Sequence, residues 1–96
     1  MAALTLTSPH QRPLRPLVEA AIQNELRLLE AGIRRGEERL RVFEAKYNLS
    51  TQEFLRRYGD DELPETLDYA EWIGEYQLLM RLREKAETLE AIRFAD

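Results

Sequence analysis

The sequence predicts an all-α protein built as a long antiparallel helical hairpin with a short corner helix. Apolar residues recur at heptad spacing from 22 to 47, which is typical of a long helix with one buried seam. A second amphipathic stretch covers residues 65–93. Between them, residues 48–64 carry helix-stop and helix-start signals. Two long helices and a turn are therefore the simplest architecture.

The composition is that of one small folded domain. Apolar residues make up 44% of the 96 residues, which is too much for a disordered chain that carries 33% charged residues. The net charge of −4 gives no reason to expect nucleic acid or an anionic membrane as a partner. There is no cysteine, so disulfides and thiolate metal sites are excluded. No stretch is apolar enough for a signal peptide or membrane span, and we expect a cytoplasmic protein.

Residues 1–16 are expected to form an extended, flexible N-terminal tail. Leu4 and Leu6 alternate with threonines, which is a weak strand pattern. Prolines at 9, 13 and 16 leave room for a helix only from Pro13 or Pro16 onward. The tail is either a frayed end or a segment that becomes ordered on a partner, for example by adding a strand to a sheet edge.

The first helix is predicted over 17–47, at the start of a single helical domain covering 17–96. Two i,i+4 pairs, Glu30–Arg34 and Glu37–Arg41, are expected to support its exposed side. Gly32 is a possible helix end, but the seam keeps its register beyond it, which favours a continuous helix with a possible kink. Gly36 lies on the seam and would let another helix pack closely. The seam residues are Ile22, Leu26, Leu29, Ile33, Gly36, Leu40, Phe43 and Tyr47.

The corner segment reads NLSTQEF. Ser50 is a good N-cap, and Glu53 three residues later completes a capping box. Leu49 and Phe54 occupy the two positions of a hydrophobic staple, and Asn48 suits the left-handed end of the preceding helix. A short helix over 51–58 is expected to follow and to stop at Gly59.

The last helix is predicted over 65–93, and its apolar side chains cover an arc of roughly 220°. One neighbouring helix cannot cover so wide a face. Tyr69, Trp72 and Tyr76 on this face are either core residues or interface anchors, since tryptophan and tyrosine are typical hot-spot residues of protein interfaces. The candidate partner-interface residues are Tyr69, Trp72, Ile73, Tyr76, Leu79 and Met80.

The predicted lengths point to self-association. Helices of about 31 and 29 residues are roughly 46 and 43 Å long, whereas a compact chain of this size has a radius of gyration near 12–13 Å. The two helices should therefore pair as a hairpin. A homodimer, completed as a four-helix arrangement, or a complex with another protein would cover the remaining apolar surface.

A ladder of carboxylates in the last third of the chain raises the alternative of an enzyme. Such ladders hold Mg²⁺ in all-helical nucleotide pyrophosphohydrolases, which carry paired acidic motifs on two helices. The D-x-x-E at 68–71 has no matching motif on the first helix, and complementing the helix dipole explains these acids as well. The only histidine, His10, lies in the tail, so we assign no catalytic, metal or cofactor residue. The ladder comprises Glu62, Glu65, Asp68, Glu71 and Glu75.

Glu75 is a possible buried charge. It projects between Leu79 and Leu82 on the apolar arc, where a carboxylate needs a cationic partner. An arginine of the first helix or of a partner chain would serve. The alternative is an edge residue whose carboxylate reaches water.

The stretch FEAKYNLSTQEFLRRYGDDELPETLDYAEWIGEYQLL, residues 43–79, resembles a pattern in small, mostly uncharacterised prokaryotic helical proteins. Many of these look like antitoxin partners in toxin–antitoxin gene pairs. The resemblance implies a protein partner such as a toxin, and it brings no catalytic or binding residues. A ribbon-helix-helix antitoxin would follow LTLT with two short helices, whereas three prolines and one long helix follow here, so DNA binding is not implied.

Three hypotheses result. The leading one is a non-enzymatic, antitoxin-like module that binds and neutralises another protein. The second is a self-assembling structural or adaptor coiled coil. The third is a Mg²⁺-dependent nucleotide pyrophosphohydrolase using Asp68, Glu71 and Glu75.

Overall fold

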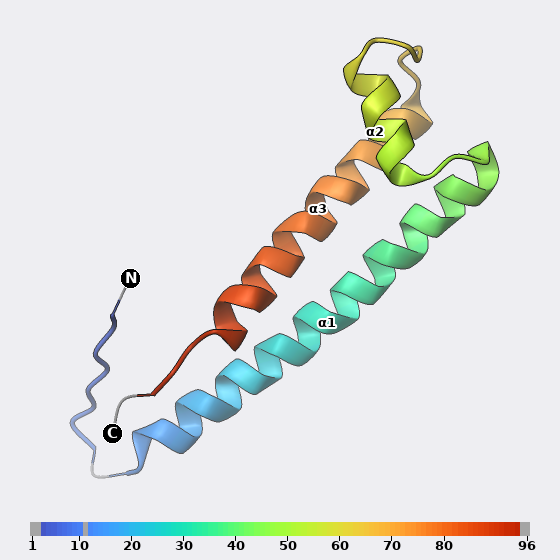
Figure 1. Cartoon of the computed structure of the whole chain (residues 1–96). Helices are drawn as coiled ribbons and strands as arrows, with labels where there is room; N and C mark the ends of the chain where they lie inside the picture. Colours follow the sequence, from blue (N-terminus) through green and yellow to red (C-terminus); the bar gives the residue numbers. More distant parts are fainter. Residues whose placement is uncertain (1–2, 11, 95–96) are drawn as a thin grey trace.

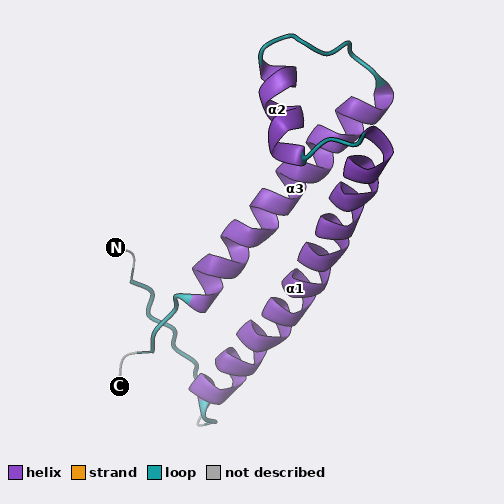
Figure 2. Ribbon diagram, turned by 45° about the vertical axis from the view of Figure 1, so that its right-hand side comes forward, coloured by secondary structure: helices purple, strands orange, loops and turns teal. Residues whose placement is uncertain are grey.

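The computed structural model describes residues 3–10 and 12–94 and contains three helices (Figure 1). They are α1 (Leu14–Tyr47), α2 (Thr51–Gly59) and α3 (Leu67–Glu90). No strand occurs in the described part of the chain. The chain reverses direction around α2, and α1 and α3 lie side by side in both ribbon views (Figures 1 and 2). This confirms the all-α class.

The molecule is elongated. Its radius of gyration is 19.2 Å, and it measures 60 × 25 × 18 Å along its principal axes. A compact chain of this length would have a radius of gyration of about 13 Å. The core is therefore a narrow strip between α1 and α3, widened only where α2 covers one end.

Helix α1 begins one turn earlier than the predicted residue 17. Pro13 is the N-cap residue, and Pro16 lies in the first turn, where a missing N–H removes no helical hydrogen bond. The helix then runs without a break through Gly32 and Gly36. Residues 3–10 have no helix or strand, and residues 1–2 and 11 of the predicted tail lie outside the described residues.

Helix α3 is shorter than the predicted span 65–93. The Thr66 hydroxyl accepts the Tyr69 N–H at 3.1 Å, which makes Thr66 the N-cap and leaves Glu65 outside the helix. At the other end the Arg93 guanidinium donates to the carbonyl of Glu90 at 3.2 Å. The prediction of matched lengths was wrong, because α1 has 34 residues and α3 has 24. The N-terminal part of α1 therefore extends past the end of α3.

The predicted seam of α1 faces α3. Leu26, Leu29 and Leu40 are buried along it, and so is Gly36. A Cβ atom placed on Gly36 would lie 3.3 Å from Leu79 Cδ1, so the absence of a side chain allows the close approach of α3.

The predicted i,i+4 ion pairs on α1 are replaced by others. The Glu37 carboxylate accepts a hydrogen bond of 3.1 Å from Arg83 on α3. Arg41 pairs instead with Glu38, one turn away, at 2.7 Å. Glu30 and Arg34 do not form an ion pair. The i,i+4 rule considers only residues of the same helix. It could not show that Arg83 of α3 lies beside α1 and binds Glu37 in place of Arg41.

Candidate functional site

The corner is built around the Trp72 side chain, which is completely buried. The Phe54 ring stacks on the indole with centroids 3.9 Å apart and planes 2° apart, and Phe43 lies nearly parallel to it at 5.5 Å. The indole N–H donates a 3.0 Å hydrogen bond to the Thr51 hydroxyl. Trp72 thus joins all three helices.

Burial divides the six candidate interface residues. Trp72 and Leu79 are 0% and 1% exposed, so a partner cannot reach them in this conformation. The other four, which remain partly exposed, are Tyr69, Ile73, Tyr76 and Met80. Helix α2 covers part of the wide apolar arc of α3, for which the sequence analysis predicted no neighbour within the chain.

A groove of about 380 Å³ lies between α1, the start of α2 and α3. Tyr76 and Met80 line it over Leu40 and Leu79. Its charged rim includes Arg83, which is bound to Glu37 of α1. An apolar floor with a ring of charges is the usual form of a protein-binding surface. The groove therefore gathers two of the predicted interface residues on one accessible face.

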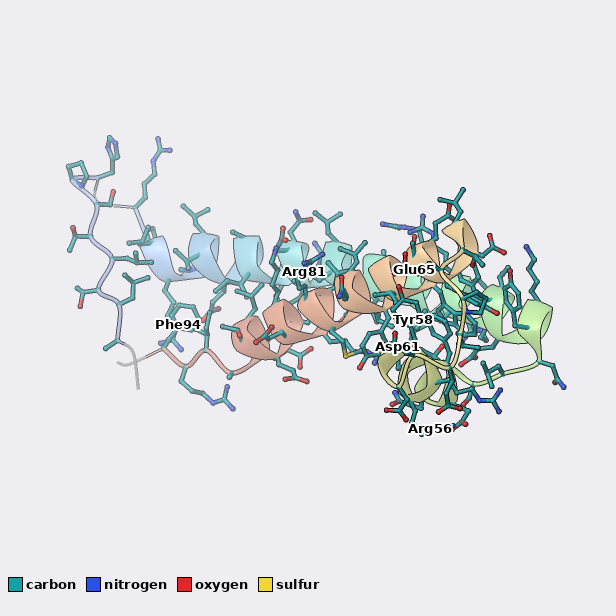
Figure 3. The ribbon with its side chains drawn as sticks, turned by 90° about the horizontal axis from the view of Figure 1, so that it is seen from above. Arg56, Tyr58, Asp61, Glu65, Arg81 and Phe94 are labelled. Carbon is teal, nitrogen blue, oxygen red and sulfur yellow. The ribbon has the colours of Figure 1, made fainter. Side chains whose placement is uncertain are left out.

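The cap at Ser50 has the predicted position. Its hydroxyl accepts the Glu53 N–H at 3.1 Å. The Glu53 carboxylate, however, accepts hydrogen bonds from Arg56 and Arg57 at 2.8 and 3.1 Å, so only this half of the capping box is formed as predicted. Those guanidinium groups hold the pKa of Glu53 at about 2. Figure 3 shows Arg56 pointing outward from α2.

Both ends of the corner are closed by left-handed residues. Asn48 has φ 49°, as predicted, and the Leu49 N–H bonds the Glu44 carbonyl at 3.1 Å. At the end of α2 the left-handed residue is Asp61, with φ 56°, and not Gly59. The Glu62 N–H then reaches the Arg57 carbonyl at 2.9 Å, which completes a Schellman motif. Leu49 packs against the cluster that contains Phe54, consistent with the staple.

The carboxylates of the hydrolase hypothesis are dispersed. Asp68 accepts hydrogen bonds from Lys46, at 2.6 Å, and from the Tyr47 hydroxyl, and these contacts lower its pKa. Glu75 pairs with Arg39 of α1 at 3.4 Å, and its side chain is 26% exposed. Glu71 is exposed. Within 3–10 and 12–94, no three His, Cys, Asp or Glu side chains are grouped so that they could hold a metal ion.

A second apolar groove lies at the opposite end, where α1 extends past α3. Four α1 residues, Leu17, Val18, Ala21 and Ile22, line it together with Leu89 of α3. The Arg15 guanidinium lies 5.1 Å from the centroid of the Phe94 ring, and Figure 3 shows Phe94 beside the N-terminal part of α1. Sequence reasoning missed this groove because it assumed helices of equal length.

Comparison with known proteins leaves the chain without an assigned family. No family model, no curated protein and no solved structure matches it. None of the described helices has the length and apolar character needed to cross a membrane.

Proposed function

We propose that the chain is a non-enzymatic protein–protein interaction module that acts in the cytoplasm and neutralises another protein in the manner of an antitoxin. The observation that carries the proposal is the groove formed by Tyr76 and Met80 at the corner. Tyrosine supplies rigid contact area, and methionine adapts to the shape of a partner. The charged rim around Arg83 would set the orientation of that partner.

The ion pairs favour this function over a Mg²⁺-dependent hydrolase. Asp68 is bound to Lys46 and Tyr47, and Glu75 is bound to Arg39. A metal site would have to break both pairs, and Glu71 would be the one carboxylate of the three without an ion pair in the described residues. Asp68 and Glu75 join α3 to α1 through these pairs.

The experiment is a titration of the full chain with the purified product of the gene next to its own. Tyr76→Ala should weaken the complex, because it removes an aromatic side chain that lines the groove. Gln77→Ala, on an exposed and adjacent position of α3, is the matched control. No binding by the unaltered chain, or equal binding by both variants, would contradict the proposal.

The second candidate function is self-assembly of two copies into a four-helix arrangement. The groove at the extended end of α1 favours it, because Leu17 and Ala21 are exposed there beside Leu89. Sedimentation over a range of concentrations tests it. Val18→Asp should abolish the dimer, whereas Thr88→Asp on exposed α3 should not. A strictly monomeric chain would exclude this candidate.

A further inference from the structure

The outward side of α1 carries a surface that, apart from Leu17, belongs to neither groove. At 100° per residue, it lies opposite the buried seam. Three large apolar side chains, Leu17, Leu28 and Val42, are 62%, 60% and 59% exposed on it. Three exposed arginines share it. We define the back face of α1 as Leu17, Arg27, Leu28, Arg34, Arg35 and Val42.

The spacing of these residues is that of a coiled-coil contact. Leu28 and Arg35 are seven residues apart, and so are Arg27 and Arg34. Seven residues span about 10.5 Å along a helix, so each pair falls two turns apart on nearly the same line. Leu28, Arg35 and Val42 thus form one heptad line, in which Arg35 lies between the two apolar side chains, and Arg27 and Arg34 form a charged line beside it. A helix that offers both apolar and acidic side chains can pack on such a mixed surface.

The three arginines of the back face have no carboxylate partner within the described chain. Arg27 donates only to the Asn24 amide oxygen, at 3.3 Å, and Arg34 and Arg35 have no ion pair. Other α1 cations do find carboxylates: Arg39 pairs with Glu75, and Lys46 pairs with Asp68. The side of α1 that carries exposed Leu28 thus has three arginines without a carboxylate partner in the described chain, while Glu38, also exposed on this side, is bound to Arg41.

We propose that the back face of α1 binds an acidic amphipathic helix of another protein. Its apolar side chains would cover Leu28 and Val42, and its glutamates would pair with Arg27, Arg34 and Arg35. This inference rests on the proposed interaction function, but it uses a surface separate from the groove of Tyr76 and Met80.

Two other occupants fit the back face less well. A second copy would bring like charges together: parallel pairing sets each arginine against itself, and antiparallel pairing centred at Ala31 sets Arg27 against Arg35. Nucleic acid phosphates would satisfy the arginines but leave Leu28 and Val42 exposed to water. An acidic helix satisfies both the charges and the apolar surface.

The experiment uses the full chain and two synthetic peptides of about four heptads with leucine at the core positions. One peptide has glutamate at the flanking positions, and the other has lysine there. Fluorescence anisotropy should show binding of the acidic peptide and none of the basic one. Arg27→Gln with Arg34→Gln should weaken binding roughly fivefold, and Leu28→Gln should weaken it roughly tenfold.

The controls are Arg81→Gln with Lys85→Gln for the charges, and Leu78→Gln for the apolar contact, all at exposed positions of α3. These variants should bind as the unaltered chain does, with unchanged helical circular dichroism in every case. The proposal would be overturned if both peptides bind equally or if the control variants lose as much binding as the back-face variants. Tighter binding of a DNA duplex, or a dimer of the chain that Leu28→Gln abolishes, would also overturn it. Tyr76→Ala should leave peptide binding unchanged. The proposal for the back face and the proposed function of the corner groove can therefore be contradicted independently.

Discussion

The Trp72 indole N–H and the Thr51 hydroxyl form a buried hydrogen bond of 3.0 Å between α3 and the first residue of α2. Thr51 is the one buried polar side chain in the part of the chain that the structure describes. Its own N–H donates to the Glu44 carboxylate of α1 at 2.8 Å. Thr51 therefore connects the three helices. Its hydroxyl is the acceptor for the buried Trp72 indole N–H, and this hydrogen bond fixes how α2 packs on α3.

Thr51→Val should destabilise the chain by about 1–3 kcal/mol. The substitution keeps the shape of the side chain but leaves the buried Trp72 N–H without an acceptor. Urea unfolding measures the change. Thr88→Val, which removes an exposed hydroxyl bound to the Glu84 carbonyl, is the control and should stay within about 0.5 kcal/mol. Equal stability of the two variants would show that the hydrogen bond contributes nothing.

Ser50→Ala should cost about 1 kcal/mol of stability, because the Glu53 N–H loses its acceptor at the start of α2. Ser50→Asp keeps an acceptor at the N-cap and should retain most of the stability. Thermal melting distinguishes the two. A Ser50→Ala chain with unchanged stability but lost partner binding would show that this corner is a binding site instead of a structural one.

Two glycines should respond oppositely to substitution. Gly74→Ala should stabilise α3 by about 0.4–1 kcal/mol, since a Cβ there meets nothing within 4 Å and alanine favours the helix. At Gly36 the new Cβ would press on Leu79 at 3.3 Å, which offsets that gain, and Gly36→Leu should destabilise strongly. Denaturant unfolding of the three variants is the measurement. A stable Gly36→Leu chain would contradict the close packing of α1 and α3.

The chain should become less stable in acid, because Glu53 is protonated there and loses its ion pairs. Hydrogen bonds from Arg56 and Arg57 lower its pKa from 4.5 to about 2 in the folded chain. A carboxyl with a lowered folded pKa contributes stability above its unfolded pKa, and this contribution is lost as the pH falls from about 4.5 to about 2. Hydrogen bonds from Lys46 and, to a smaller extent, from Tyr47 also lower the pKa of Asp68. Protonation of Asp68 in acid should therefore reduce stability as well.

Melting temperatures measured across that pH range test this. Glu53→Gln should flatten the acid-side decline, while Glu71→Gln, at an exposed position without an ion pair in the described chain, should change it less. Identical pH profiles for Glu53→Gln and the unaltered chain would mean that the pairs with Arg56 and Arg57 do not persist in solution.

Much of the fold could be predicted from local signals. The heptad seam identified buried Leu26, Leu29 and Leu40, and its unbroken register identified a helix that continues through Gly32. Ser50 and Asn48 were recognised because capping chemistry depends on neighbours in the sequence.

Most misses came from interactions between distant residues. The sequence does not reveal that Phe54 of α2 stacks on Trp72 and covers part of the α3 arc. A local miss is the start of α3: the Thr66 hydroxyl caps the Tyr69 N–H three residues on, so the helix starts at Leu67 and not at the predicted residue 65. Residue type identified Tyr76 and Met80 as interface candidates. It could not show that they remain accessible while Trp72 is buried, because that difference depends on tertiary packing.

We propose that this chain acts by binding another protein through exposed side chains of a fold that is already formed. The most direct measurement is calorimetric titration of the neighbouring gene's product into the unaltered chain and into Tyr76→Ala, with Gln77→Ala as control. We expect a one-to-one or higher-order complex that Tyr76→Ala weakens by about tenfold or more and that Gln77→Ala leaves unchanged. Absence of heat and of a complex at every concentration, or a complex indifferent to Tyr76, would contradict it.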